Sequence, residues 1–220
     1  MGALITSCKQ QVDLENHPVI ASTEWRSLIS RAYGELFTIV ANSGLRYFET
    51  SANVVSDGTN VLAEMSNHFE TVTLAYLAQA SPARYIDLRE AMAQEEAMLS
   101  GQTGSYARYF SIVDDEILLF PTPPTGQTYR MRYVPQPPDL SGYADDACVD
   151  VVTPDGHEFL IWNVAVKAMA KTEADARLAQ SEREQARARF TEAIQLRALN
   201  APRRRIVVDD DPDNWDRDRW

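Results

Sequence analysis

The sequence predicts an α+β protein, in which an antiparallel helical bundle carries an inserted antiparallel β region and an extended C-terminal arm. Apolar residues recur at helical spacing near both ends of the chain and alternate with polar residues in the middle. A chain of 220 residues can also bury a core without disulfides or metals. We therefore expect residues 1–44 and 141–200 to form the bundle. Residues 45–140 would form the β insertion with one short helix, and residues 201–220 the arm.

Two helices are predicted in the N-terminal part. The first covers residues 3–14 and should end before Pro18, because the residue preceding a proline is disfavoured in helical conformation. The second starts with Thr23 as its N-cap and closes at Gly44, which can adopt the left-handed conformation common after a helix. Its apolar stripe consists of Trp25, Leu28, Ile29, Ala32, Leu36, Ile39 and Val40.

The middle of the chain is predicted to be antiparallel β structure. Asp57-Gly58 is a strong signal for a hairpin turn, and Asp114-Asp115 lies between two further strands that should pair. A proline-rich turn then leads from an apolar strand to the last strand, which should pair with it. The expected strands are residues 47–55, 60–64, 69–77, 106–113, 116–120 and 128–134, with a short helix at 88–99.

Helical spacing returns at Asp155, and residues 158–170 form a long apolar helix. Its polar side chains are confined to Asn163, Lys167 and Lys171 at four-residue spacing. So narrow a polar stripe predicts a helix that lies centrally in the bundle.

The last helix is predicted at residues 172–199, with a Glu173–Arg177 pair on its surface. Its apolar side is thin, so the helix should pack through one face only. The residues on that side are Leu178, Ala179, Ala186, Phe190, Ala193 and Ile194.

The composition changes after Asn200, where Pro202 stops the helix. A basic cluster, a short β-prone run, an acidic run and two tryptophans follow. Buried aromatic residues dominate the energetics of interfaces, so the tryptophans are predicted anchors for a partner. The predicted docking residues are Arg203, Arg204, Arg205, Ile206, Val207, Val208, Trp215 and Trp220.

Composition argues against several classes of protein. The formal net charge of -11 is unfavourable for sequence-specific DNA binding, which needs basic groups to neutralise phosphates. No apolar run approaches the ~20 residues that span a bilayer, so we expect no membrane association and synthesis in the cytosol. Two cysteines, Cys8 and Cys148, are too few for a secreted disulfide framework.

No motif in the sequence supports catalysis. His17, His68 and His157 have no spacing that suggests a shared metal. Neither a phosphate-binding loop ending in G-K-[ST] nor a G-x-S-x-G nucleophile motif is present. We therefore predict no catalytic residue, no metal site and no cofactor.

Three runs of sequence, taken in order, resemble the head-to-tail adaptor (connector, or head-completion) proteins of tailed bacteriophages. The first is E-W-x-x-L-I-x-x-A-Y-x-E-L-F at residues 24–37. The second is E-I-L-L-F-P at 116–121 with Y-x-x-x-Y-x-P-x-P at 129–137. The third is the helix at 159–170 followed by K-T-E-A-D.

The resemblance implies a structural virion protein rather than an enzyme. Such proteins form a ring, commonly of twelve subunits, below the portal protein in the virion neck, after assembly in the host cytoplasm. The ring extends the DNA channel, with genomic DNA as non-specific cargo, and it presents a surface to the next neck or tail protein. The C-terminal arm in such rings often contacts the portal or a neighbouring subunit.

Two alternatives stay open at this point. One is another neck ring, such as a stopper or tail-completion protein, which would differ in its partner surfaces. The other is a small cytosolic protein that binds a ligand through its β region. A ring that forms only on the portal would favour the adaptor, and a monomer that binds a small molecule would favour the last alternative.

Overall fold

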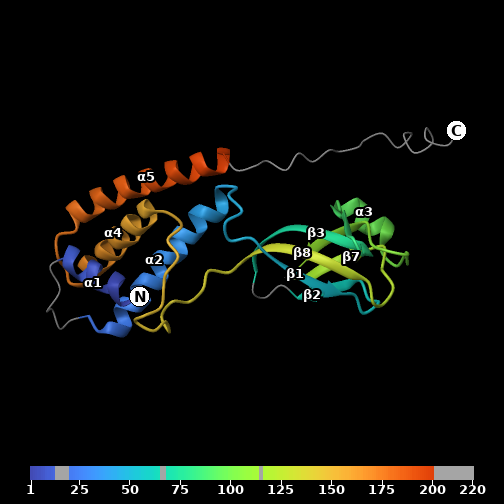
Figure 1. Ribbon diagram of the computed structural model, residues 1–220, viewed down its shortest axis with the longest axis horizontal. Helices are drawn as coiled ribbons and strands as arrows, with labels where there is room; N and C mark the ends of the chain where they lie inside the picture. The colour runs from blue at the N-terminus through green and yellow to red at the C-terminus, as the bar shows by residue number, and fades with distance from the viewer. Residues whose placement is uncertain (13–19, 65–67, 114–115, 201–220) are drawn as a thin grey trace.

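The computed structural model describes residues 1–12, 20–64, 68–113 and 116–200, and in these it shows helices at both ends of the chain with β structure between them (Figure 1). The elements are α1 (Gly2–Gln11), α2 (Ser22–Asn42), β1 (Thr50–Val55), β2 (Val61–Glu64), β3 (His68–Ala80), β4 (Ala83–Asp87), β5 (Arg89–Glu90), α3 (Ala93–Leu99), β6 (Tyr109–Val113), β7 (Glu116–Phe120), β8 (Thr128–Pro135), α4 (Pro154–Lys171) and α5 (Arg177–Asn200). The predicted mixed α+β class and the helix–β–helix order are confirmed.

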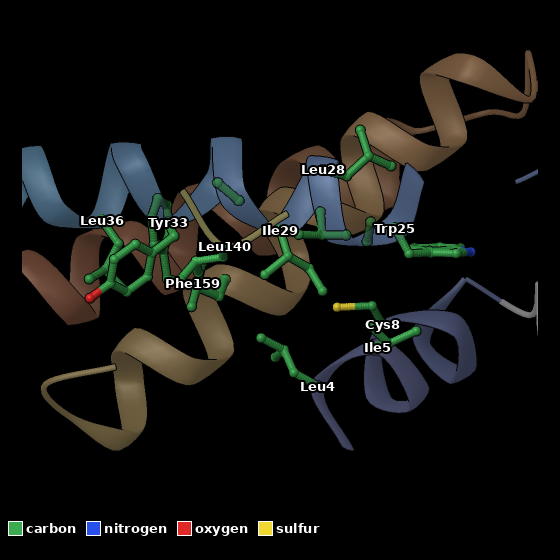
Figure 2. Close-up of a cluster of buried hydrophobic side chains, with 14 of the residues drawn as sticks. Leu4, Ile5, Cys8, Trp25, Leu28, Ile29, Tyr33, Leu36, Leu140 and Phe159 are labelled. Atoms are coloured by element: carbon green, nitrogen blue, oxygen red, sulfur yellow. The ribbon is translucent and has the colours of Figure 1, made fainter. Parts of the chain in front are cut away.

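The four terminal helices share one apolar core, in which α4 contacts α1, α2 and α5. Figure 2 shows side chains of α1 and α2, together with Leu140 and with Phe159 of α4, in this core. The largest fully buried side chains here are Trp25, Phe37, Phe159 and Phe190. Cys8 is also buried in this core, which raises the pKa of its thiol to about 12, whereas Cys148 is exposed.

Helix α2 agrees with the predicted apolar stripe but not with the predicted cap. It begins at Ser22 after Ala21, whose side chain makes no capping bond, so Thr23 is a first-turn residue and the predicted cap is wrong. The predicted end is confirmed, because Gly44 has a φ of +76°. Helix α4, unlike α2, has a side-chain cap at its N-terminus. The Thr153 hydroxyl accepts a hydrogen bond from the Gly156 amide at 3.1 Å.

Replacing Thr153 by alanine should therefore lower the free energy of unfolding by about 1 kcal/mol, the usual cost of losing an N-cap. Chemical denaturation monitored by circular dichroism would measure this change. Thr23→Ala is the matched control, because Thr23 is exposed and caps no helix in the structure. Equal losses in the two variants would contradict the assignment of Thr153 as the cap.

Helix α5 begins at Arg177, later than predicted. Glu173 lies before the helix with a φ of 56°, so the predicted Glu173–Arg177 helical pair does not form, and Arg177 lies 3.8 Å from Asp175 instead. Leu178 is 72% exposed, which makes its assignment to the apolar side wrong. Burial of the other predicted residues is confirmed for Ala179, Ala186, Phe190 and Ile194.

The strands form two four-stranded sheets with the orders β1-β8-β3-β4 and β2-β7-β6-β5. Both predicted turns at Asp57-Gly58 and after Phe120 therefore connect strands of different sheets, and these two hairpins are wrong. The physical reason lies at Ser56, whose backbone bonds with Gln127 and Gly126 continue the pairing of β1 with β8. The predicted pairing of β6 with β7 is confirmed, although Asp114 and Asp115 lie outside the described residues.

Several strand bounds differ from the prediction. Strand β1 begins at Thr50, because Phe48 stacks on Phe37 of α2 instead, with ring centroids 4.1 Å apart. Strands β4 and β5 were not predicted as strands, and β5 takes the place of the first residues of the expected 88–99 helix. The pairing of β5 with β6 is parallel, unlike the other pairings in the two sheets.

A second apolar core lies within the β region. Tyr129 of β8 is fully buried there, and its hydroxyl accepts a hydrogen bond from the Ala107 amide at 3.1 Å. The helical part and the β region thus have separate cores, joined by the chain segments after α2 and after β8 (Figure 1). Glu49 lies at this junction between Arg46 and Arg132, at 3.3 and 3.9 Å.

Candidate interaction surfaces

The predicted docking residues of the arm cannot be placed, since Arg203, Arg204, Arg205, Ile206, Val207, Val208, Trp215 and Trp220 all lie outside the described residues. The structure does define where the arm begins. Arg197 in the last turns of α5 donates a hydrogen bond to the Val152 carbonyl at 2.9 Å. Near Val152, the Tyr47 hydroxyl donates to Asp150 at 2.9 Å. The arm therefore leaves α5 from a helix end tied to the loop before α4.

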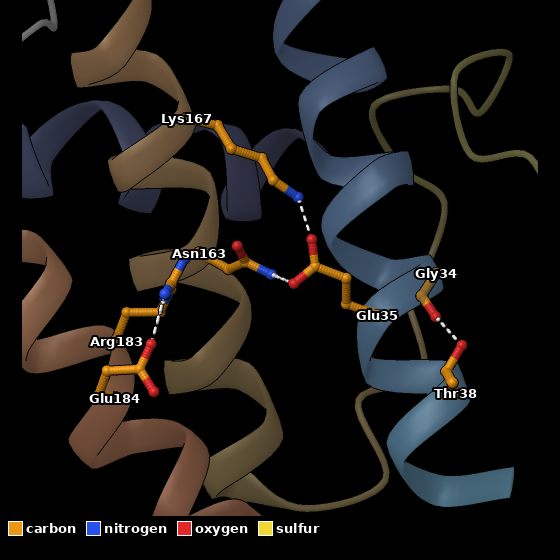
Figure 3. A network of polar contacts seen from close by, with 7 residues as sticks. All are labelled: Gly34, Glu35, Thr38, Asn163, Lys167, Arg183 and Glu184. Carbon is orange, nitrogen blue, oxygen red and sulfur yellow. Dashed lines mark hydrogen bonds and ion pairs between the residues drawn. The ribbon is translucent and has the colours of Figure 1, made fainter. Parts of the chain in front are cut away.

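A row of polar contacts joins α2 to α4 (Figure 3). The Asn163 amide donates to Glu35 Oε2 at 2.7 Å, and Lys167 Nζ donates to Glu35 Oε1 at 2.5 Å. Three turns before Glu35 on α2, Glu24 pairs with Lys171 of α4. The polar stripe predicted on α4 thus meets carboxylates of α2, and these contacts fix the register of two antiparallel helices.

Asn163 is the most deeply buried polar residue in this row of contacts. Its side chain is fully buried, and its Oδ1 has no hydrogen-bond partner among the described residues. A buried polar atom without a hydrogen-bond partner costs free energy. The hydrogen bond that the Asn163 amide donates to Glu35 offsets part of this cost. Sequence reasoning identified the stripe on α4 but missed Glu24 and Glu35 as its partners. The signal was available, because these two carboxylates are three helical turns apart and therefore share a face.

The acidity of Glu35 is tuned by this arrangement. Burial by itself would raise the pKa of the carboxyl, but hydrogen bonds from Lys167 and Asn163 outweigh burial and hold its pKa below its usual value. A carboxyl whose pKa is lower in the folded state stabilises the fold above its unfolded pKa, and it loses that contribution as the pH falls through the folded pKa.

Glu35→Gln should therefore lower the free energy of unfolding at pH 7 by about 1 kcal/mol or less, since the Glu35 side chain is 52% exposed and solvent screens the pair. The difference between variant and wild type should shrink as the pH falls below the ordinary Glu pKa of 4.5 and vanish below the lowered pKa that Glu35 has in the folded state. Urea denaturation across this pH range measures both values. A deficit that is constant with pH would show that packing, rather than charge, is responsible.

A groove of about 380 Å³ opens between α2 and α5, with Phe159 of α4 among its lining residues. Arg31 and Arg187 line it from α2 and α5, and both are exposed. Neither guanidinium makes a hydrogen bond or ion pair with any residue that the structure describes. The other lining residues are Gly34, Glu35, Thr38 and Ile39.

Exposed apolar side chains are scattered over separate elements rather than gathered on one face. They occur before β1 and at its end, in β4, in and beside α3, at the end of β6 and at both ends of α5. The large apolar side chains that are exposed among the described residues are Tyr47, Val55, Ile86, Met92, Met98, Ile112, Val113, Leu178, Leu196 and Leu199. Helix α3 buries none of its residues. Its methionines present a polarisable surface that suits a protein partner.

The chemistry available for catalysis or metal binding is sparse in the described part of the chain. No group of three or more His, Cys, Asp or Glu side chains that could hold a metal ion occurs there. His157 is exposed in the first turn of α4, while His17 lies outside the described residues. Within the same ranges, the structure contains no helix with both the length and the apolar character needed to cross a membrane.

Comparison of the chain with protein families gives a match. A family model described as SU10 adaptor protein matches residues 3–212. The matched region includes the basic cluster and the β-prone run of the arm, and it ends before Trp215 and Trp220. No curated protein matches the sequence significantly.

Proposed function

The chain belongs to the SU10 adaptor protein family, a family of phage adaptor proteins, and we propose that it acts as a head-to-tail adaptor in the virion neck. The resemblance to phage adaptors is thus confirmed at the level of the family. As a phage adaptor, the protein is a structural component of the virion that associates with other head or tail proteins.

The proposed role is a ring of about twelve subunits below the portal, which extends the DNA channel and offers a surface to the next neck or tail protein. The observation that carries this proposal is the family match across almost the whole chain. The charge is compatible with it. A net charge of -11 disfavours lasting contacts with DNA phosphates, so the duplex could pass without being held.

We assign the parts of the chain accordingly. Residues 1–44 and 141–200 would build the body of the ring, and residues 45–140 would form an insertion outside or below it. Residues 201–220 would be the docking arm, with Arg203–Arg205 pairing with acidic groups of a partner and Trp215 and Trp220 filling apolar pockets. In this role the protein has no catalytic task and needs no cofactor.

Assembly in the presence of portal protein tests the proposal. The free subunit should elute from size-exclusion chromatography as a monomer of 24.7 kDa by light scattering, because its exposed apolar side chains are scattered and an obligate interface needs a larger apolar patch. Added to purified portal, it should form a complex with about twelve copies per portal, visible by mass photometry.

Other outcomes would redirect the assignment. A stable ring without portal would contradict assembly on the portal. A ring that forms only on another neck protein would favour a stopper or tail-completion role. A monomer that ignores portal but binds a small molecule would contradict a structural role altogether.

A further inference from the structure

The groove between α2 and α5 combines two features that point to an occupant. The first is charge: Arg31 and Arg187 face the groove without an ion pair to a described residue. Glu35, the carboxylate that also lines it, is already bonded to Lys167 and Asn163. Glu184, one turn from Arg187 on α5, forms its ion pair with Arg183, and the attraction of Arg187 contributes least to the lowering of the Glu184 pKa. The groove therefore retains two cationic groups for an anionic ligand.

The second feature is Gly34, which lies in the middle of α2 and lines the groove. Glycine inside a helix costs about 1 kcal/mol relative to alanine, so it usually has a packing or functional reason. Here a Cβ atom added to Gly34 would meet nothing within 4 Å. No packing among the described residues needs this glycine, whereas a ligand that approaches the α2 backbone closely would.

The chain itself contains a segment with the complementary chemistry. Residues 209–220 carry six aspartates against two arginines, together with Trp215 and Trp220. A planar indole can lie against the α2 backbone at Gly34, and it can accept a guanidinium over its face. The β region is a poor alternative for this segment, because residues 45–140 carry twelve carboxylates and six arginines and would repel it.

The segment is also within reach of its own groove. The distance along α5 from Arg187 back to its end at Asn200 is about 20 Å at the rise of an α-helix. Residues 201–208 span up to about 26 Å when extended, which is enough to bring Asp209 back to Arg187. Pro202 places a break directly after the helix, where the chain must turn.

We propose that the groove between α2 and α5 binds the acidic, tryptophan-bearing segment 209–220 of the same chain. Arg31 and Arg187 pair with the aspartates, and the indole of Trp215 or Trp220 packs against Gly34 between them. The free subunit thus holds its arm on its own surface until a partner competes for it. This inference concerns the isolated subunit and does not depend on the role in the neck proposed above.

A competition experiment on the full chain tests the proposal. The probe is a fluorescent peptide with the sequence of residues 206–220, and its binding is followed by fluorescence anisotropy. A second form of the full chain, the vacated variant, has the anchors of the segment removed. It carries Asp209→Asn, Asp210→Asn, Asp211→Asn, Asp213→Asn, Trp215→Ala and Trp220→Ala.

The peptide should bind the vacated variant and bind wild type at least tenfold more weakly, because a tethered segment competes at a high effective concentration. Adding Arg31→Ala and Arg187→Ala to the vacated variant should weaken binding at least tenfold, and added salt should weaken it further. Gly34→Leu should block the groove without disturbing the fold, given the open space at Gly34. Arg177→Ala, on α5 but outside the groove, is the matched control and should change nothing.

Equal binding of the peptide to wild type and the vacated variant would overturn the proposal, since the segment would then not occupy its own groove. Binding that survives both the double arginine variant and Gly34→Leu would overturn it as well. Thermal melts of every variant confirm that folding is retained. Neither negative result bears on portal-dependent assembly, which is measured separately.

Discussion

Phe190→Ala should destabilise the protein by about 3–5 kcal/mol, the range for removing a large aromatic side chain from a well-packed core. Phe190 is fully buried and stacks on Phe159 of α4 with ring planes 8° apart and centroids 5.9 Å apart. The ring of Phe190 also packs closely on Gly156 of α4, where an added Cβ would lie 3.0 Å from Phe190 Cε2. The remaining buried residues of α5 are two alanines and Ile194, so Phe190 is the main attachment of this helix.

Leu178→Ala is the control on the same helix. Its side chain is 72% exposed, and surface substitutions of this kind usually change stability by less than about 0.5 kcal/mol. Urea denaturation of both variants against wild type gives the two values. If Phe190→Ala lost no more stability than Leu178→Ala, the packing of α5 on α4 would be wrong.

The helices were predictable because their signals are local. The apolar stripe of α2 was correct in its residues because a helical face is fixed by spacing within one segment. The cap was not correct, since a side chain such as Thr23 can only cap if the backbone enters the helix at that residue. The start of α5 failed for a related reason: Glu173 turns the chain before the helix begins.

Strand pairing was predicted less well because it depends on distant segments. The turn chemistry at Asp57-Gly58 was sound, as Gly58 has a φ of +93° and Asp57 accepts a hydrogen bond from the Thr59 amide. A turn signal, however, does not say which strand will pair with the one before it. The strand that pairs with β1 is β8, which lies more than seventy residues further along the chain.

The candidate surfaces also combine features that one segment determines with features that depend on several distant segments. The polar stripe of α4 could be predicted from the sequence. Its contacts with Glu24 and Glu35 could not, because they depend on how α4 packs against α2. The groove required three helices, because Arg31, Phe159 and Arg187 lie on α2, α4 and α5. No periodicity within one segment can bring these residues together. The arm remains a prediction, since none of its residues is described.

Deleting residues 201–220 should leave the subunit folded but abolish its assembly into the neck. Among the described residues, the last one buried in either apolar core is Ile194, so we expect both cores to form without the arm. Circular dichroism and thermal melting should therefore resemble wild type. Binding to portal-containing heads should fall at least a hundredfold, because truncating a hot-spot aromatic costs about 2–4 kcal/mol and the arm has two tryptophans.

A shorter deletion separates the parts of the arm. Removing residues 213–220 eliminates both tryptophans but keeps the segment 201–212, which falls inside the family match. If the tryptophans are the anchors, the two deletions should reduce binding alike. If only the longer deletion reduces binding, Arg203–Arg205 and Ile206–Val208 carry the docking.

Ordering the roughly twenty residues of the arm costs conformational entropy, so weak anchors could not hold the arm on a partner. A subunit without residues 201–220 that still joins heads and supports tail attachment would show that the docking contacts lie on the folded part of the chain.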